Sequence, residues 1–89
     1  MAMRSPLTIF YFAWVRERIG TACETLCPPD DVHDVGALLA WLCRQSPRHA
    51  AVLSDTAAIR VAINQDHAHL DAVIPEGAEI AIFPPVTGG

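Results

Sequence analysis

The chemistry that this sequence offers is concentrated in its last two residues, Gly88 and Gly89. Glycine carries no Cβ and reaches backbone conformations that are closed to other residues. A Gly-Gly end can therefore enter a narrow channel in another protein and present its terminal carboxylate as the reacting group. Most chain ends are poorly ordered, so the pair is informative only together with the residues that precede it.

The residues before the glycines favour a tail that is directed outward. Phe83 closes a strand-like segment, and Pro84 and Pro85 follow it directly. Proline has no N–H and a nearly fixed φ, so the two prolines stop a sheet ladder and direct the chain away from it. Six residues of extended chain span roughly 20 Å. We expect a domain over residues 1–83 and an extended tail over residues 84–89.

Length and composition predict one small domain that binds a protein partner. The chain has 89 residues, and 52% of them are hydrophobic, so part of the apolar surface should face a partner. The net charge is -4, and the six basic residues, all arginines, are scattered, which argues against nucleic acid. The longest apolar run, residues 7–15, is too short for the roughly 20 residues of a membrane span. Three cysteines form no set of pairs, which favours a reducing, cytoplasmic location.

The hydrophobic pattern predicts a hairpin followed by a helix. Residues 7–14 are rich in β-branched and aromatic side chains and are predicted to form a strand, residues 16–20 a turn, and residues 22–27 the returning strand. The helix that follows is expected to end at Ser46 and Pro47, and residues 49–53 can add a helical turn. Its apolar stripe, with i, i+3, i+4, i+7 spacing, consists of Val35, Leu38, Leu39 and Leu42.

The second half of the chain completes an α+β fold. Residues 59–64 alternate as a strand, residues 65–69 are polar and turn-like, residues 70–74 are predicted as a short edge strand, and residues 79–83 as the last strand. One helix must cover one face of one mixed sheet to close a single core. We therefore predict a ubiquitin-like β-grasp with parallel first and last strands at its centre, one main helix on one face, and a flexible diglycine tail.

Alternation along the first strand leaves an aromatic face. If Leu7 and the odd-numbered residues after it face the core, then Phe10, Phe12 and Trp14 lie on the opposite side, where Phe83 joins them. We interpret this face as a docking patch beside the exit of the tail, because aromatic anchors commonly dominate binding energy. The alternative is that a loop or a second layer covers it.

Other chemically capable residues form no catalytic or metal-binding constellation. Cys23 and Cys27, four apart on a strand, would lie about 13 Å apart, beyond the ~7 Å reach of a disulfide. Cys43 lies beside the leucine stripe and is expected to act as a small apolar side chain. His67 and His69 can share one side of a strand, but no third ligand accompanies them. We expect neither a bound cofactor nor a metal.

Three segments together resemble the small, sulfur-carrying subunits of molybdopterin synthase. They are residues 11–20, which contain Phe-Ala-x-Val-Arg-Glu, residues 61–65, and residues 77–89 with their Phe-Pro-Pro and Gly-Gly end. The likeness spans nearly the whole chain, and the last segment is its most specific part.

The resemblance implies a β-grasp carrier whose terminal carboxylate becomes a thiocarboxylate. In that family an activating enzyme uses ATP with magnesium to adenylate the C-terminal glycine, and a sulfur donor then supplies the sulfur. The large synthase subunit accepts the tail, and the sulfur passes to cyclic pyranopterin monophosphate, twice for each molybdopterin dithiolene. The usual assembly is a heterotetramer. The carrier is thus a co-substrate whose partners are the large subunit, the activating enzyme and the sulfur donor.

The resemblance also assigns roles to single residues. Gly89 would carry the sulfur and Gly88 would allow entry of the tail. Phe12 and Phe83 match interface positions of the family. The remaining predicted contacts with the partner are Phe10, Pro84, Pro85, Val86 and Thr87.

Two departures from the family pattern concern the patch. His67 stands where an apolar residue is usual and is expected to weaken that edge of the patch. Trp14 is bulkier than usual and is expected to enlarge the exposed patch. The Ala78 of a Gly-Ala-Glu stretch, where Gly-Asp-Glu is commoner, is a minor difference.

Several alternative functions share the fold and the diglycine end. One is a β-grasp sulfur carrier for the thiazole of thiamine or for thiolation of tRNA, against which the Phe-Pro-Pro end and the length argue. Another is a ubiquitin-like modifier, which a lysine adduct would reveal. A third is an interaction module with an inert tail, which would work unchanged without Gly88 and Gly89.

Overall fold

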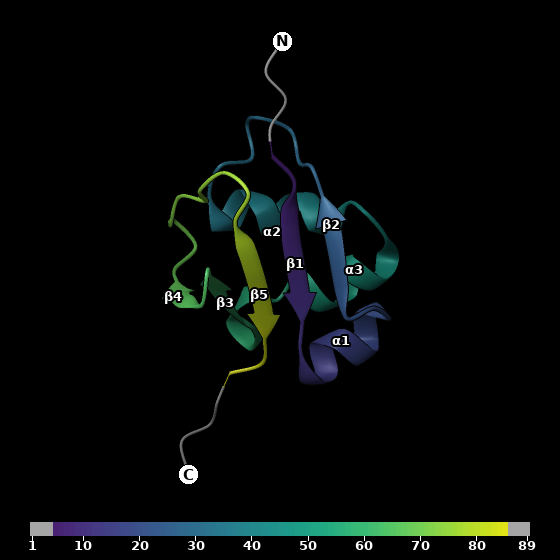
Figure 1. Ribbon diagram of the computed structural model, residues 1–89. Helices are drawn as coiled ribbons and strands as arrows, with labels where there is room; N and C mark the ends of the chain where they lie inside the picture. The colour runs from purple at the N-terminus through teal and green to yellow at the C-terminus, as the bar shows by residue number, and fades with distance from the viewer. Residues whose placement is uncertain (1–4, 86–89) are drawn as a thin grey trace.

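A five-stranded mixed sheet forms the centre of the molecule in the computed structural model, which describes residues 5–85 (Figure 1). The strand order is β2-β1-β5-β3-β4, in which β3 is Arg60–Ile63 and β4 is Asp66–Ala68. The two central strands, β1 (Leu7–Tyr11) and β5 (Glu79–Phe83), run parallel, as the sequence predicts. β2 (Cys23–Leu26) pairs with β1 in antiparallel fashion. The α+β class and the β-grasp arrangement are thus confirmed.

Two helices cover one face of the sheet. They are α2 (Val35–Cys43) and α3 (Pro47–Leu53), and a 3₁₀ turn, η1 (Thr56–Ala58), follows them. Asp34 caps α2, since its Oδ1 accepts a 2.7 Å hydrogen bond from the backbone N–H of Ala37. Ser46 caps α3 in the same way, and Pro47 occupies the first turn, where a missing N–H costs nothing. The Ser-Pro pair therefore separates two helices, as expected.

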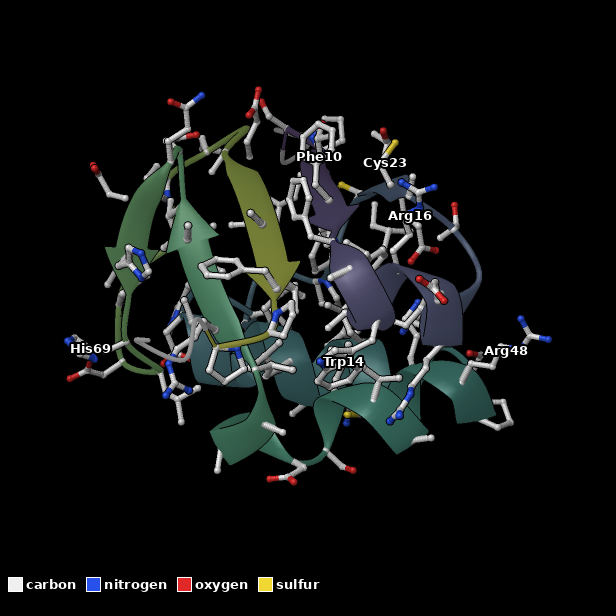
Figure 2. The ribbon with its side chains drawn as sticks, turned by 90° about the horizontal axis from the view of Figure 1, so that it is seen from below. Phe10, Trp14, Arg16, Cys23, Arg48 and His69 are labelled. Atoms are coloured by element: carbon white, nitrogen blue, oxygen red, sulfur yellow. The ribbon has the colours of Figure 1, made fainter. Side chains whose placement is uncertain are left out.

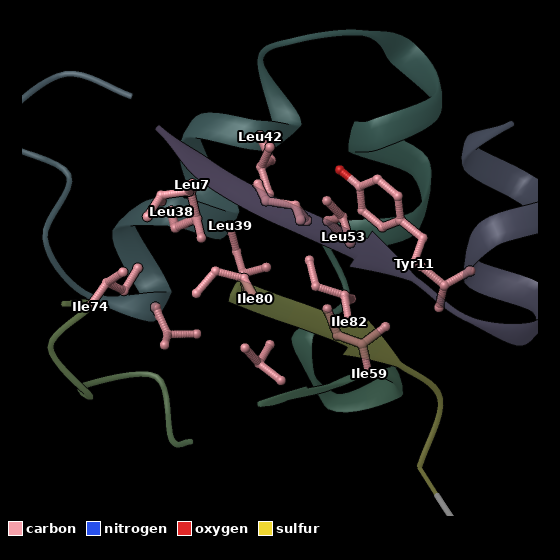
Figure 3. Packing of buried hydrophobic residues seen from close by; sticks show 14 of the residues in the cluster. Leu7, Tyr11, Leu38, Leu39, Leu42, Leu53, Ile59, Ile74, Ile80 and Ile82 are labelled. Atoms are coloured by element: carbon pink, nitrogen blue, oxygen red, sulfur yellow. The ribbon is translucent and has the colours of Figure 1, made fainter. Parts of the chain in front are cut away.

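The apolar stripe of α2 closes the core against the central strands. Figure 3 shows its leucines gathered over β1 and β5. The side chains that are most completely buried come from both layers and include Leu7, Ile9, Leu38, Leu39, Leu42, Ile80 and Ile82. Burial of such side chains is the main favourable term in folding, at ~25 cal/mol per Å² of apolar surface. The opposite face of the sheet carries no helix in the part of the chain that the structure describes.

The predicted turn at residues 16–20 is wrong, because this segment belongs to a helix, α1 (Ala13–Ile19). The strand stops after Tyr11, and Ala13, with φ 53°, turns the chain sharply into the helix. From there the apolar period changes from two to about four, so that Val15 and Ile19 are both buried. Gly20 ends the helix in the left-handed region, with φ 97°.

The predicted position of Trp14 is wrong for the same reason. Its side chain belongs to α1, packs against the hydrophobic core and is only partly exposed. The guanidinium of Arg18 lies over the indole ring, 4.8 Å from its centroid. Figure 2 shows Trp14 on the helix side of the sheet and Phe10 on the other side. Trp14 therefore does not enlarge the exposed aromatic face.

The edge strand lies earlier in the chain than predicted. β4 (Asp66–Ala68) pairs with β3 (Arg60–Ile63), whereas the predicted edge strand at residues 70–74 is a loop. A two-residue turn joins β3 to β4, with positive φ at both Asn64 and Gln65. This left-handed geometry matches the twist of a hairpin and usually requires glycine at the second position. Without that glycine the sequence gives little sign of the hairpin.

The loop after β4 is held against the start of α2. The N–H groups of Val35 and Gly36 donate to the carbonyls of Ala72 and Leu70, at 3.1 and 2.8 Å. These donors have no partner inside the helix, so the loop satisfies them. A Cβ on Gly36 would lie 3.3 Å from the Leu70 oxygen, which explains a glycine in the first turn.

One polar cluster lies between the sheet and α3. Glu24 Oε2 accepts a hydrogen bond from the Tyr11 hydroxyl at 2.7 Å and lies 2.7 Å from His49 Nε2. The Oγ of Ser46 lies 2.7 Å from Nδ1 of the same imidazole. Burial by itself raises the pKa of Glu24, but its hydrogen bonds to His49 and Tyr11 and the charge of His49 outweigh burial and lower this pKa. Burial, together with Glu24, raises the pKa of Tyr11.

Candidate functional site

The open face of the sheet carries a continuous row of side chains. In register across all five strands, this row consists of Cys23, Phe10, Ala81, Ala62 and His67. Paired residues of neighbouring strands point to the same side, so the row crosses the whole face that the helices leave open. Figure 2 shows Phe10 and Cys23 next to each other on this side. The predicted orientation of Phe10 is thus observed.

Phe10 and Phe12 meet at a shallow hollow beside β5. The hollow has a volume of about 220 Å³, and its lining also includes Ala81, Glu79 and Gln65. Phe10 is half-buried, whereas Phe12 is 49% exposed and is one of the few large apolar side chains at the surface. Phe12 lies just beyond β1, where its N–H donates to Ile82 across the sheet at 3.1 Å. The hollow therefore exposes apolar surface that a partner could bury.

Phe83 lies at the carboxyl end of β5, where the tail begins. It is the cross-strand partner of Arg60, and its ring meets the His67 imidazole edge-on, with 5.6 Å between centroids. His67 therefore adds a ring to this edge of the open face in place of the usual apolar side chain. Whether it weakens partner binding, as the sequence predicts, stays a prediction.

The prolines of the tail follow Phe83 directly. Pro84 and Pro85 have left the sheet and are half-buried. Figure 1 shows the strand leaving at the end of the sheet where β1 gives way to α1. The predicted contact residues Val86 and Thr87 and the predicted reactive residues Gly88 and Gly89 lie outside the described residues.

The remaining candidates from the sequence stay separate. Cys23, Cys27 and Cys43 form no disulfide with one another, and burial raises the pKa of the Cys43 thiol. The cytoplasmic location stays a prediction.

β4 ends at Ala68, so His69 lies outside the strand. Among residues 5–85, no three histidine, cysteine or acidic side chains gather as a metal site would require. In the same range, no helix is long and apolar enough to cross a membrane.

Two residues of the hollow were missed by reasoning from the sequence. Glu79 is the first residue of β5, and its backbone is held by Asn64, whose Oδ1 accepts from its N–H at 2.9 Å and whose N–H donates to its carbonyl at 2.8 Å. Gln65 approaches the same place from the β3–β4 turn. Strand parity could have placed Glu79 on the face of Phe83, but only the unpredicted hairpin brings Gln65 beside it.

The fold and this face define a class of protein: a small β-grasp domain with an aromatic sheet face next to the start of its tail. The chain belongs to the ThiS family, whose model matches residues 9–89. The molybdopterin synthase sulfur carrier subunit of Escherichia coli K12 is 37% identical over 83 residues, which are 93% of this chain and 99% of that protein. The subunit of the same name from Haemophilus influenzae is also 37% identical, with the same coverage.

Solved structures agree with this fold. SAMP1 from Haloferax volcanii has a TM-score of 0.75 and 29% identity, over 96% of this chain and 100% of that one. A protein of Pyrococcus furiosus described as a putative molybdopterin converting factor, subunit 1, also has a TM-score of 0.75. It is 22% identical, covering 92% of this chain and 99% of that one, and supports the fold alone.

Proposed function

We propose that this chain is the sulfur carrier subunit of a molybdopterin synthase. The observation that carries the proposal is 37% identity over almost the full length to subunits of that name, within a family match that extends to Gly89. The open face with Phe10, Phe12 and Phe83 supports it, because a carrier must dock on a partner while its end reacts.

In the proposed cycle Gly89 is the only residue of this chain that reacts. Its carboxylate attacks the α-phosphate of ATP on a separate activating enzyme, with magnesium bound to the nucleotide there, and pyrophosphate leaves. Sulfide-level sulfur from a donor then attacks the acyl carbon and displaces AMP, which leaves a thiocarboxylate. ATP is needed because a carboxylate oxygen is a poor leaving group until it is phosphorylated.

The large synthase subunit would then receive the charged tail. The thiocarboxylate sulfur forms a carbon–sulfur bond with cyclic pyranopterin monophosphate as an oxygen substituent leaves. Water next cleaves the acyl–sulfur bond and restores the Gly89 carboxylate. Groups for proton transfer would come from the large subunit, and two carriers would supply the two sulfurs of the dithiolene in a heterotetramer.

The test starts from the thiocarboxylate form of the chain. It is mixed with the large subunit and cyclic pyranopterin monophosphate, and the intact mass is followed for replacement of sulfur by oxygen at Gly89. Loss of sulfur that requires both additions is the expected result. Retention of sulfur, with both additions known to be active, would overturn the proposal. Omission of either addition serves as the control.

A second candidate function is protein modification. It is favoured by the likeness to the small archaeal modifier protein 1 of Haloferax volcanii, at 28% identity and a TM-score of 0.72. A modifier would join its terminal carboxylate to a lysine amine instead of taking up sulfur. This chain contains no lysine, so every isopeptide adduct would lie on a different protein. Mass spectrometry of lysine adducts from cells would distinguish this candidate from a sulfur carrier.

A further inference from the structure

We propose that the hollow between Phe10, Phe12 and Glu79 binds one arginine side chain of the large subunit. This inference rests on the proposed function, because it names a contact on the docking face of that complex. The inference adds to the apolar docking face the type of side chain that the partner contributes. That side chain is a guanidinium, and it projects from a partner surface complementary to the sheet face.

The size of the hollow suits a single side chain. Its volume of about 220 Å³ is below the ~300–1,000 Å³ of pockets that hold small-molecule ligands. Its apolar walls are the rings of Phe10 and Phe12 and the methyl group of Ala81. Arginine can lay its methylene stem against such walls, and its planar guanidinium stacks on aromatic rings.

The polar side of the hollow specifies a positive charge. The Glu79 carboxylate and the Gln65 amide both border it. Within residues 5–85, the Glu79 carboxylate forms no hydrogen bond or ion pair, so it is available to a partner. A carboxylate accepts both N–H groups of a guanidinium in a bidentate pair, and an amide oxygen can accept a further one.

The backbone that carries this carboxylate is held in place before any partner binds. Asn64 holds both backbone polar groups of Glu79, at 2.9 and 2.8 Å, so the start of β5 is locked to the β3–β4 turn. Binding therefore has to order only the side chain of Glu79 and not the strand that carries it. Docking of an apolar side chain would instead remove water from the carboxylate without replacing its hydrogen bonds, which is unfavourable. The geometry therefore favours a positively charged side chain of the partner in the hollow over an apolar one.

The Glu79 side of the hollow lies at the end of β5 that is remote from the tail. Glu79 begins β5 and Phe83 ends it, so the two lie roughly 13 Å apart along the strand on the same face. The tail continues from Phe83, at the opposite end of the strand from Glu79. Contact at Glu79 should therefore change affinity for the large subunit and leave the chemistry at Gly89 unaltered.

The experiment measures binding to the purified large subunit by calorimetry at two salt concentrations. We compare the full-length wild-type chain, Glu79→Gln, and Asp30→Asn, a matched change of charge on an exposed turn outside the hollow. Glu79→Gln should weaken binding by about tenfold or more at both salt concentrations, since a hydrogen bond to a charged group is stronger than one to a neutral group. Asp30→Asn should stay within about twofold of wild type. Melting temperatures of the free variants check that both are folded.

The outcomes separate this inference from the function on which it rests. If wild type binds and Glu79→Gln binds within twofold of it, or more tightly, the arginine contact is wrong. If folded wild type does not bind the large subunit at all, the proposed function itself fails. As the positive test, Glu79→Arg should abolish binding, and reversal of one arginine of the large subunit to glutamate should restore it. Failure of every such reversal to restore binding would also overturn the inference.

Discussion

Glu24 on β2 and His49 on α3, 25 residues apart in the sequence, meet through a 2.7 Å contact between Oε2 and Nε2. The same oxygen accepts the Tyr11 hydroxyl hydrogen from β1, also at 2.7 Å. One carboxylate oxygen thus joins the edge strand, a central strand and a helix. Tyr11 and His49 are both buried, so their donors have few other partners available.

Removal of the Glu24 acceptor should destabilise the fold. Glu24→Leu leaves the Tyr11 hydroxyl and the His49 ring N–H without their partner, at ~1–3 kcal/mol for each buried donor. Glu24→Gln keeps an oxygen and should cost only about 1 kcal/mol. Urea titration of each variant gives its free energy of unfolding, which is compared with that of wild type. Glu17→Gln, on the exposed side of α1, is the control and should change it by less than about 0.5 kcal/mol. Equal stability of Glu24→Leu and wild type would contradict a structural role for the cluster.

The same carboxylate should make stability depend on pH in the acid range. Its pKa is lowered in the folded state, so the unfolded chain binds the proton more tightly. The stabilisation is therefore present above the ordinary glutamate pKa of 4.5 and is lost as the pH falls through the lower folded value. We measure the free energy of unfolding of wild type and of Glu24→Gln by urea titration from pH 7 to pH 3. The difference between the two should become smaller below about pH 4.5. A difference that is constant over this range would refute the prediction.

Gln65→Gly should stabilise the hairpin between β3 and β4. Gln65 has φ 75°, a region that glycine occupies without strain, and Asn-Gly is the preferred pair for this turn. We expect a gain of about 0.5–1 kcal/mol in the free energy of unfolding, measured by thermal denaturation. Gln65→Ala, which keeps a Cβ at positive φ, is the matched control and should give no such gain. A loss of stability with glycine would mean that the glutamine side chain itself holds the turn.

Phe12→Ala should weaken docking without unfolding the chain. The side chain is 49% exposed, and Phe12 caps α1 through its backbone alone, so the stability should fall by less than about 1 kcal/mol. Affinity for the large subunit should fall by at least tenfold, as expected for an aromatic anchor. Val73→Ala removes a side chain that is 72% exposed and belongs to the loop after β4, outside the hollow, and serves as the control. Equal affinities of the two variants would show that the open face is not the interface.

Deletion of Gly88 and Gly89 should separate docking from chemistry. The proposed contacts of the sheet face remain in the shortened chain, so it should still bind the large subunit within about tenfold of wild type. It should support no sulfur transfer, because the residue that would carry the sulfur is gone. Calorimetry measures binding to the large subunit, and the intact-mass assay measures sulfur transfer, on the same samples. Undiminished activity of the shortened chain would instead identify an interaction module with an inert tail.

Local patterns in the sequence were sufficient for the main elements of the fold. The leucine stripe of α2 and the alternation of β3 and β5 follow from the periods of helix and strand, which depend only on neighbouring residues. The positions of Phe10 and Phe83 on the open face of the sheet follow from the same alternation. The Gly-Gly end and the Phe-Pro-Pro stretch are properties of the sequence itself, and they indicate the proposed function without any coordinates.

Tertiary structure alone decided where these local patterns stop. β1 ends at Tyr11 because Ala13, at positive φ, turns the chain into α1, so Trp14 joins the helix side. The contacts of Glu24 with His49, and of Gln65 with the hollow around Glu79, connect residues that are distant along the chain. Such contacts form only when the sheet and helices assemble. The periodicity of a single helix or strand does not specify which strand edge meets which helix. The sequence therefore determined the main elements and the proposed reactive end, and the assembled sheet determined the surface beside the tail.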